Sequence, residues 1–162
     1  WRSPEVSRPI DVSGRFSTNY DRDTVEFQRN RMAKIFGDQL ETGRVSPRGY
    51  WKEIRNAKIL LSPFGYGEIC HRDFEGFLSG NILLKPDMSH IKTWPPIFEN
   101  NETYVGISWN MNDVIDTVNN VLDQYNEYRD IATKGQKRYC KYLVGETAKK
   151  QFVDHFENLL KN

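Results

Sequence analysis

The side chains best suited to chemistry follow a glycine-containing turn in the middle of the chain. The turn places two glycines around a tyrosine, and the positions after it carry several ionisable groups. These residues are Gly65, Tyr66, Gly67, Glu68, His71, Arg72 and Glu75. Glycines allow a backbone to approach a ligand closely, and basic groups at such a turn can neutralise a phosphate. The segment therefore predicts an anion-binding site.

Two apolar runs flank this segment, at residues 58–61 and 82–84. Both runs are continuous rather than alternating, which is typical of strands buried on both faces of a parallel sheet. We therefore predict a strand, the glycine turn, a helix starting near Glu68, and a second strand. In this arrangement the N-terminus of the helix, a natural site for anions, lies beyond the end of a strand.

The spacing of the predicted helix separates an apolar face from a charged one. Cys70 and Phe74 lie on the face expected to pack on the sheet, so we expect Cys70 in the core rather than as a nucleophile. Glu68, Arg72 and Glu75 share another side. That side could be a solvated surface with ion pairs of a few tenths of a kcal/mol each. Its position past a buried strand, where open α/β sheets bind ligands, favours a binding site.

The chemistry of these side chains suggests a separate role for each. Arg72 and His71 would neutralise a diphosphate at the start of the helix. Glu75, one turn deeper, could accept hydrogen bonds from a ribose diol, and Glu68 could bind sugar hydroxyls. Lys85 could contact phosphate or sugar, or it could lie at a solvated strand end.

The rest of the chain alternates strands with helices, which indicates a layered α/β domain. Further strands are predicted at residues 9–13, 40–45 (weakly) and 104–109. Helices are predicted at residues 24–36, from 47 onward, at 114–125, and over most of the remainder. Residues 1–8 are predicted to be a linker or incoming segment, because the stretch is polar and prolines stand at positions 4 and 9.

Composition and charge argue against several classes of function. The 162 residues carry 23 basic and 22 acidic side chains, a net charge of +1, which argues against nucleic-acid binding. No apolar run approaches the ~20 residues of a membrane span. Two cysteines, Cys70 and Cys140, make no disulfide framework and suit a reducing compartment. His90 and His155 lack partners at metal-ligand spacing, so no metal site is predicted. Because the chain begins at Trp1, we expect it to be part of a longer polypeptide.

Short motifs also follow one another in a recognisable order. They are Gly14-Arg15 after a strand, Gly43-Arg44-Val45, Tyr50, and the segments 57–63, 71–75, 75–80 and 131–135. In order and spacing they resemble the C-terminal, donor-binding domain of GT-B glycosyltransferases of the group-1 type, including exostosin-like relatives. The resemblance covers most of residues 9–160.

The resemblance implies a Rossmann-like, three-layer α/β domain over residues 9–162. Such a domain has a parallel sheet of about five or six strands, helices on both faces and a helical C-terminal tail. It would take part in sugar transfer from a nucleotide-diphosphate sugar to a glycan or other hydroxyl acceptor, without a further cofactor. The acceptor site would lie in an N-terminal domain of the same protein. The protein would be located in the cytoplasm or at the cytosolic face of a membrane.

The resemblance also implies roles for individual residues. Glu75 would bind the nucleotide ribose, Arg15 would reach a phosphate, and the segment 43–45 would frame the base. The implied donor-binding residues are Arg15, Arg44, Val45, Gly65, Tyr66, Gly67, Glu68, His71, Arg72 and Glu75. His71 and Glu68 are the candidates for a catalytic role. Many retaining members place two glutamates eight positions apart, whereas Glu68 precedes Glu75 by seven and Ser62 opens this loop.

Two alternatives stay open. The chain could be a non-catalytic module that binds a nucleotide or nucleotide sugar within a larger protein. It could also be a flavodoxin-like interaction domain that binds no nucleotide. A signalling domain of the latter kind would need an acidic cluster at the end of the first strand, where Asp11 stands alone beside Gly14-Arg15.

Overall fold

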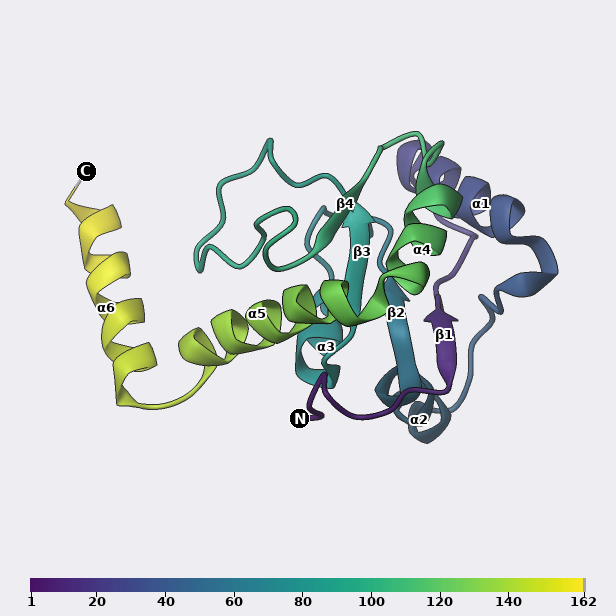
Figure 1. Cartoon of the computed structure of the whole chain (residues 1–162). Helices are drawn as coiled ribbons and strands as arrows, with labels where there is room; N and C mark the ends of the chain where they lie inside the picture. Colours follow the sequence, from purple (N-terminus) through teal and green to yellow (C-terminus); the bar gives the residue numbers. More distant parts are fainter. Residues whose placement is uncertain (162) are drawn as a thin grey trace.

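A parallel sheet of four strands forms the centre of the molecule (Figure 1). The computed structural model describes residues 1–161, so the last residue of the predicted domain lies outside the described part. The strands lie side by side in chain order, and they are β1 (Ile10–Ser13), β2 (Ala57–Leu61), β3 (Ile82–Pro86) and β4 (Val105–Ile107). The predicted α/β architecture is confirmed. The predicted count of five or six strands is wrong, because residues 1–161 form four.

Residues 40–45, predicted as a weak strand, form an irregular segment instead. Leu40 is buried and lies close against Gly14. The next residues are exposed or half-buried and mostly polar, and Val45 is 40% exposed. Because this stretch lacks a repeating apolar side, it has no face to pack against the helices, and no strand forms.

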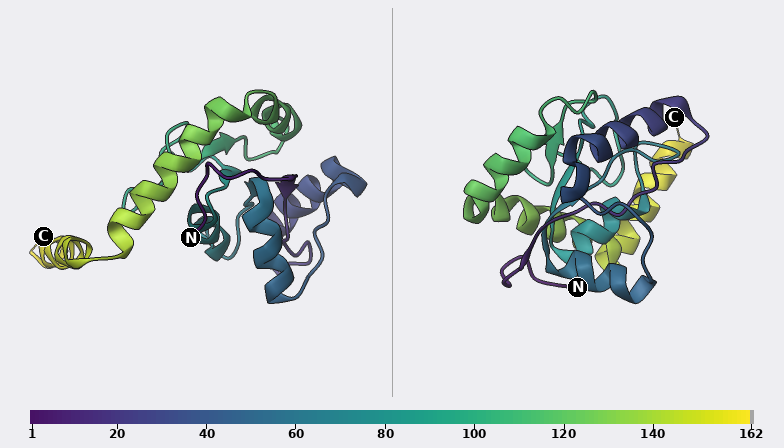
Figure 2. Two further views of the ribbon diagram at one scale, coloured as in Figure 1. Left: turned by 60° about the horizontal axis from the view of Figure 1, so that its bottom comes forward. Right: turned by 90° about the vertical axis from the view of Figure 1, so that its right-hand side faces the viewer.

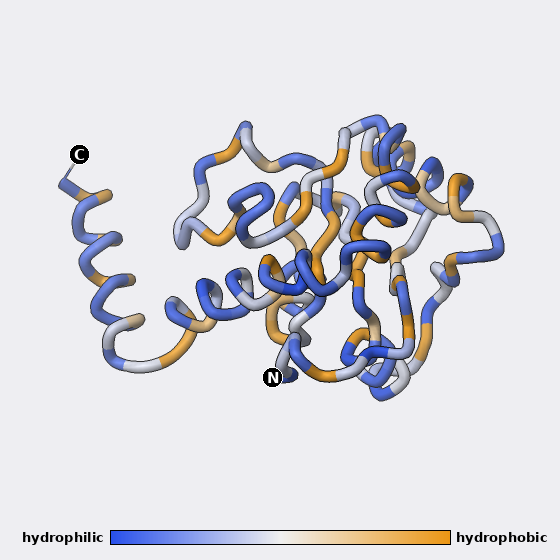
Figure 3. Tube along the Cα trace, viewed as in Figure 1, coloured by the Kyte–Doolittle hydropathy of each residue, from blue (hydrophilic) through white to orange (hydrophobic). Residues whose placement is uncertain are grey.

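The two central strands are buried on both faces, as their continuous apolar runs predict. β2 and β3 pair in register, with Leu60 opposite Leu83 and Leu61 opposite Leu84. All four leucines have exposed fractions of 0%. Hydrophobic residues gather along these strands at the middle of the trace (Figure 3). Their burial explains why the sheet can hold the loops at its carboxyl end in defined positions.

Residues 1–161 also form six α-helices and one short 3-10 helix. They are α1 (Asp23–Phe36), η1 (Gly37–Gln39), α2 (Pro47–Asn56), α3 (His71–Ser79), α4 (Val114–Asp123), α5 (Tyr125–Leu143) and α6 (Glu146–Leu160). Met32 of α1 and Val118 of α4 pack on one face of the sheet. Ile54 of α2 and Phe77 of α3 pack on the other. The domain therefore has three layers, with helices on both faces, as predicted.

The start of α2 shows how directly the local sequence determines an element. Ser46 is the N-cap, and its Oγ accepts a hydrogen bond from the backbone N–H of Gly49 at 3.1 Å. Pro47 occupies the first helical position, where its missing N–H leaves no bond unmade. The Ser-Pro pair therefore predicts this helix start correctly.

The last helix, α6, stands apart from the sheet (Figures 1 and 2). It contacts α5 and also Trp94, whose ring stacks on His155 with centroids 4.4 Å apart. Two phenylalanines of this helix lie largely at the surface, since Phe152 is 57% and Phe156 is 52% exposed.

The N-terminal segment is anchored to the end of the sheet opposite the glycine turn. Arg8 is 3% exposed, and its guanidinium donates hydrogen bonds to the carbonyl oxygens of Arg55, Ala57, Ser3 and Ser79. Burial lowers the pKa of Arg8. The four carbonyl oxygens take the place of the water that would otherwise solvate the guanidinium of Arg8. These hydrogen bonds attach the N-terminal segment to the rest of the domain.

Candidate functional site

A pocket of about 1010 Å³ opens at the carboxyl ends of β1 and β2. Three loops form its walls: the segment after β1, the irregular segment before α2, and the glycine turn after β2. The first turns of α3 form the remaining wall. Loops at the carboxyl ends of parallel strands meet at one edge, which is where open α/β sheets bind ligands.

Nine of the ten predicted donor-binding residues line this pocket. They are Arg15, Arg44, Val45, Gly65, Tyr66, Gly67, His71, Arg72 and Glu75. Residues from distant parts of the sequence, including Arg15 and Glu75, thus meet around one space. The tenth residue, Glu68, is not among the lining residues. Its carboxylate lies 3.7 Å from Nε2 of His90 instead.

Helix α3 begins at His71, so the predicted start near Glu68 is wrong. Cys70 is the N-cap, and the Asp73 carboxylate turns back to accept a hydrogen bond from its backbone N–H at 2.9 Å. This capping bond fixes the N-terminal end of the helix at Cys70, so Glu68 lies in the turn that precedes the helix. Glu68 therefore shares no helical face with Arg72.

The expectation that Cys70 lies in the core is also wrong, for the same reason. As N-cap residue it is only partly buried, and it lines the pocket. Its Sγ lies 3.2 Å from Oγ of Ser62 and 3.5 Å from Oδ1 of Asp73. Because the helix begins later than predicted, Cys70 lies outside the helical turns that pack on the sheet.

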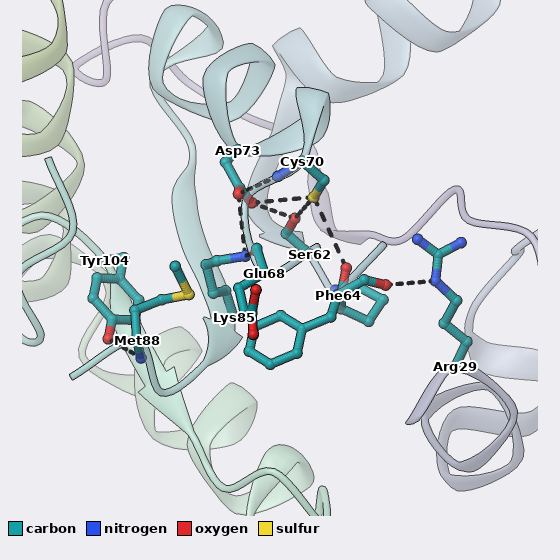
Figure 4. A network of polar contacts seen from close by, with 10 residues as sticks. Arg29, Ser62, Phe64, Glu68, Cys70, Asp73, Lys85, Met88 and Tyr104 are labelled. Carbon is teal, nitrogen blue, oxygen red and sulfur yellow. Dashed lines mark hydrogen bonds and ion pairs between the residues drawn. The ribbon is translucent and has the colours of Figure 1, made fainter. Parts of the chain in front are cut away.

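A buried ion pair supports the glycine turn from below (Figure 4). Nζ of Lys85 lies 3.1 Å from Oδ2 of Asp73, and both side chains are 0% exposed. The same ammonium donates to the backbone oxygen of Glu68 at 2.5 Å. Asp73 also accepts a hydrogen bond from Oγ of Ser62 at 2.6 Å. Lys85 therefore joins β3 to the turn and to α3, and it does not line the pocket as a phosphate ligand would.

Glu75 is oriented by a tyrosine from α2. The hydroxyl of Tyr50 donates to Oε2 of Glu75 at 2.5 Å. Burial, followed by this hydrogen bond, raises the pKa of Tyr50, so its hydroxyl stays protonated and remains a donor. Oε1 accepts no hydrogen bond from the described residues, and Glu75 lines the pocket. One carboxylate oxygen can therefore accept a hydrogen bond from a ligand hydroxyl.

Arg15 lines the pocket, but two carboxylates already bind it. Its Nε lies 2.8 Å from Oε2 of Glu53, and one of its terminal nitrogens lies 2.5 Å from Oε2 of Glu41. Burial would lower the pKa of Arg15, but the bonds to Glu53 and Glu41 outweigh it and raise the pKa. The positive charge of Arg15 is therefore already balanced within the chain.

Sequence analysis missed Arg29, which also lines the pocket. Its guanidinium is buried, at 4% exposed, and donates to the backbone oxygens of Phe64 at 2.8 Å and Ser17 at 3.0 Å. One sign of it is visible in the sequence. Arg29 falls four positions after Val25 and three before Met32, so a charged residue occupies the apolar face of a predicted helix.

Within residues 1–161, no three histidine, cysteine or acidic side chains come together in a way that could hold a metal ion. Over the same residues, no helix combines the length and apolar character that crossing a bilayer requires.

Comparison with known proteins gives matches among solved structures. No protein-family model matches the chain, and no curated protein matches it. Anabaena Alr3699/HepE, solved in complex with UDP-glucose, aligns with a TM-score of 0.61 at 10% identity, over 93% of this chain and 49% of that one. TarM aligns with a TM-score of 0.62 at 13% identity, over 95% of this chain and 36% of that one. This chain spans half or less of either length. At these identities the likeness shows the fold alone, a Rossmann-like α/β arrangement that this chain shares with both structures.

Proposed function

We propose that this chain is the donor-binding part of a glycosyltransferase and that its pocket binds a nucleotide-diphosphate sugar. One observation carries the proposal. The pocket lies at the carboxyl end of a parallel sheet and brings Arg72, Glu75 and the start of α3 together. The fold is shared with HepE, which was solved with UDP-glucose, and this supports a ligand of the same class.

Each side of the pocket suits a different part of such a ligand. The guanidinium of Arg72, with His71 beside it, would bind the diphosphate at the N-terminus of α3. Glu75, held by Tyr50, would accept hydrogen bonds from the ribose hydroxyls. The segment 43–45 would frame the base, and the backbone around Gly65 would approach the sugar and phosphates. Glu68 lies outside this set.

The chemistry proposed is transfer of the sugar to a hydroxyl acceptor. The acceptor oxygen bonds to the anomeric carbon while the bond from that carbon to the diphosphate oxygen breaks, and the electron pair leaves with the diphosphate. The positive end of α3 and the guanidinium of Arg72 stabilise the negative charge on the leaving group. The hydroxyl proton passes to a base, for which His71 is the candidate within the pocket.

The acceptor and its binding domain are proposals of the same kind. The chain spans half or less of its two structural neighbours. We propose that an acceptor-binding domain of the same protein closes over the pocket from the carboxyl side of the sheet. The acceptor would be a glycan or another hydroxyl compound, and the reaction would take place in the cytoplasm or at the cytosolic face of a membrane.

Calorimetric titration with nucleoside diphosphates and their sugars tests the proposal. We expect at least one of UDP, ADP or GDP to bind, and a ligand at ~100 times its Kd should stabilise the fold by roughly 2.7 kcal/mol. Glu75→Ala and Arg72→Ala should weaken this binding at least about tenfold, because each removes a charged partner of the ligand. Glu127→Ala and Arg48→Ala, which change exposed residues elsewhere, serve as matched controls. Absence of binding by the whole panel would contradict the proposal.

A further inference from the structure

Two buried or half-buried arginines in the pocket wall lack an acidic partner. Arg29 and Arg72 both line the pocket, and neither has a carboxylate within 4 Å among the described residues. Arg72 donates one hydrogen bond, to the backbone oxygen of Arg15 at 3.1 Å. Its Nε and one terminal nitrogen are buried and have no hydrogen-bond partner within residues 1–161. Buried guanidinium nitrogens without partners are costly, so Arg72 carries donors that its surroundings within the chain do not satisfy.

The two guanidinium groups lie beside one aromatic ring of the pocket wall. Their central carbons lie 6.0 Å and 5.8 Å from the centroid of one aromatic ring, that of Phe16. The pKa of Arg29 is lowered, first by burial and then by the positive charge of Arg72. Two like charges that disfavour each other are stabilised when an anion lies between or beside them.

Arg29 is held firmly from behind and faces the glycine turn. Its bonds to the oxygens of Phe64 and Ser17 and its stacking on Tyr20, at 4.2 Å, fix its orientation. One terminal nitrogen lies 3.6 Å from the point where a Cβ on Gly65 would stand. Because Gly65 has no side chain, the space beside this nitrogen stays open to a ligand.

The remaining charges of the pocket do not compensate this pair. Arg15 is already bound by Glu41 and Glu53. Of the two carboxylates in the pocket wall, Glu75 bonds to Tyr50, and Asp21 forms no ion pair with a described residue. Arg44 also lines the pocket without a carboxylate partner, but its side chain is exposed. The buried or half-buried positive charge that lacks compensation therefore belongs to Arg29 and Arg72.

We propose that Arg29 and Arg72 together form the site for a diphosphate group, and that Arg29 makes the pocket prefer diphosphates over monophosphates. This inference rests on the proposed function and adds a residue and a specificity to it. Two guanidinium groups can donate to two adjacent phosphate groups, whereas a monophosphate needs only one of them. Arg15 acts in this arrangement as a positioning residue, since its carbonyl oxygen accepts the bond from Arg72.

The test compares ligands that differ only in phosphate number. UDP, UMP and inorganic pyrophosphate are titrated calorimetrically into the full chain at constant ionic strength, for the unchanged protein and for Arg29→Gln. We expect Arg29→Gln to lower the affinity for UDP and pyrophosphate at least about tenfold and to lower that for UMP much less. Arg31→Gln makes the same charge change at an exposed residue of α1 that is not in the pocket wall. This control should leave the affinities for all three ligands unchanged.

Two results would overturn the inference while leaving the proposed function standing. One is an unchanged ratio of UDP to UMP affinity in folded Arg29→Gln. The other is an equal loss for all three ligands, which would mean that Arg29 only supports the pocket walls. If pyrophosphate binds through Arg29 while no nucleoside diphosphate binds, the inference holds and the proposed function fails. If the unchanged protein binds neither pyrophosphate nor any nucleoside diphosphate, the inference and the proposed function both fail.

A second variant covers the case in which Arg29→Gln does not fold. Arg29→Lys keeps the positive charge but cannot hold the two carbonyl oxygens and a phosphate in the same planar geometry. We expect it to fold and to lose at least about fivefold in UDP affinity relative to UMP. A folded Arg29→Lys with the selectivity of the unchanged protein would overturn the inference.

Discussion

At the scale of single residues, the bond between Tyr50 and Glu75 determines how the carboxylate faces the pocket. Glu75 follows Arg72 by three positions on α3, a spacing at which opposite charges attract each other on a helix. No ion pair forms between them, because Tyr50 holds Oε2 of Glu75 at 2.5 Å. The tyrosine thereby keeps both the carboxylate and the guanidinium available to a ligand.

We predict that Tyr50→Phe lowers the affinity for UDP by about fivefold to tenfold, the loss expected for one hydrogen bond of about 1 kcal/mol. Without the hydroxyl, Glu75 can turn toward Arg72 and neutralise it, so pyrophosphate should also bind more weakly. Calorimetry measures both ligands, with Tyr139→Phe as a control outside the pocket. Adding Glu75→Gln to Tyr50→Phe should restore pyrophosphate binding. If it does not, Tyr50 acts in another way.

At the scale of elements, the junction between β3, the glycine turn and α3 depends on one buried ion pair. Lys85 and Asp73 are fully buried, and each also bonds to the turn or its cap. An ion pair in such surroundings contributes to stability only while both charges are present, because either charge alone has lost its water. The position of the turn, and with it one wall of the pocket, depends on this pair.

Lys85→Met should therefore lower the free energy of unfolding by about 3–5 kcal/mol, since it leaves the Asp73 carboxylate buried without a counter-charge. Urea denaturation followed by circular dichroism measures the loss. Lys150→Met, which breaks an exposed pair with Asp154 on α6, is the matched control and should cost less than about 1 kcal/mol. The double variant Lys85→Met with Asp73→Asn should recover part of the stability. A loss no larger than that of the control would show that the pair does not support the turn.

At the scale of the whole molecule, the sequence predicts the layers better than it predicts the site. The continuous apolar runs of β2 and β3 correctly indicate strands buried on both faces, because burial determines residue type directly. The start of α3 depends instead on the hydrogen bond that the Asp73 carboxylate accepts from the backbone of Cys70. The spacing of apolar residues does not reveal this bond, and it therefore places the start of the helix about one turn too early. Arg29 is missed because its carbonyl partners come from two distant loops, and only the folded chain brings them together.

The last prediction concerns whether this chain can transfer a sugar by itself or can only bind the donor. This chain spans half or less of its structural neighbours, and the residues that we propose for donor binding lie together in one pocket. We therefore expect the isolated chain to bind a nucleotide-diphosphate sugar without transferring the sugar. Incubation with the bound donor and a series of hydroxyl acceptors should release nucleoside diphosphate at the rate of the buffer alone, while calorimetry on the same sample confirms binding. Release above that rate, abolished by Arg72→Gln but not by Arg48→Gln, would contradict this prediction and mean that the isolated chain turns over the donor without another domain.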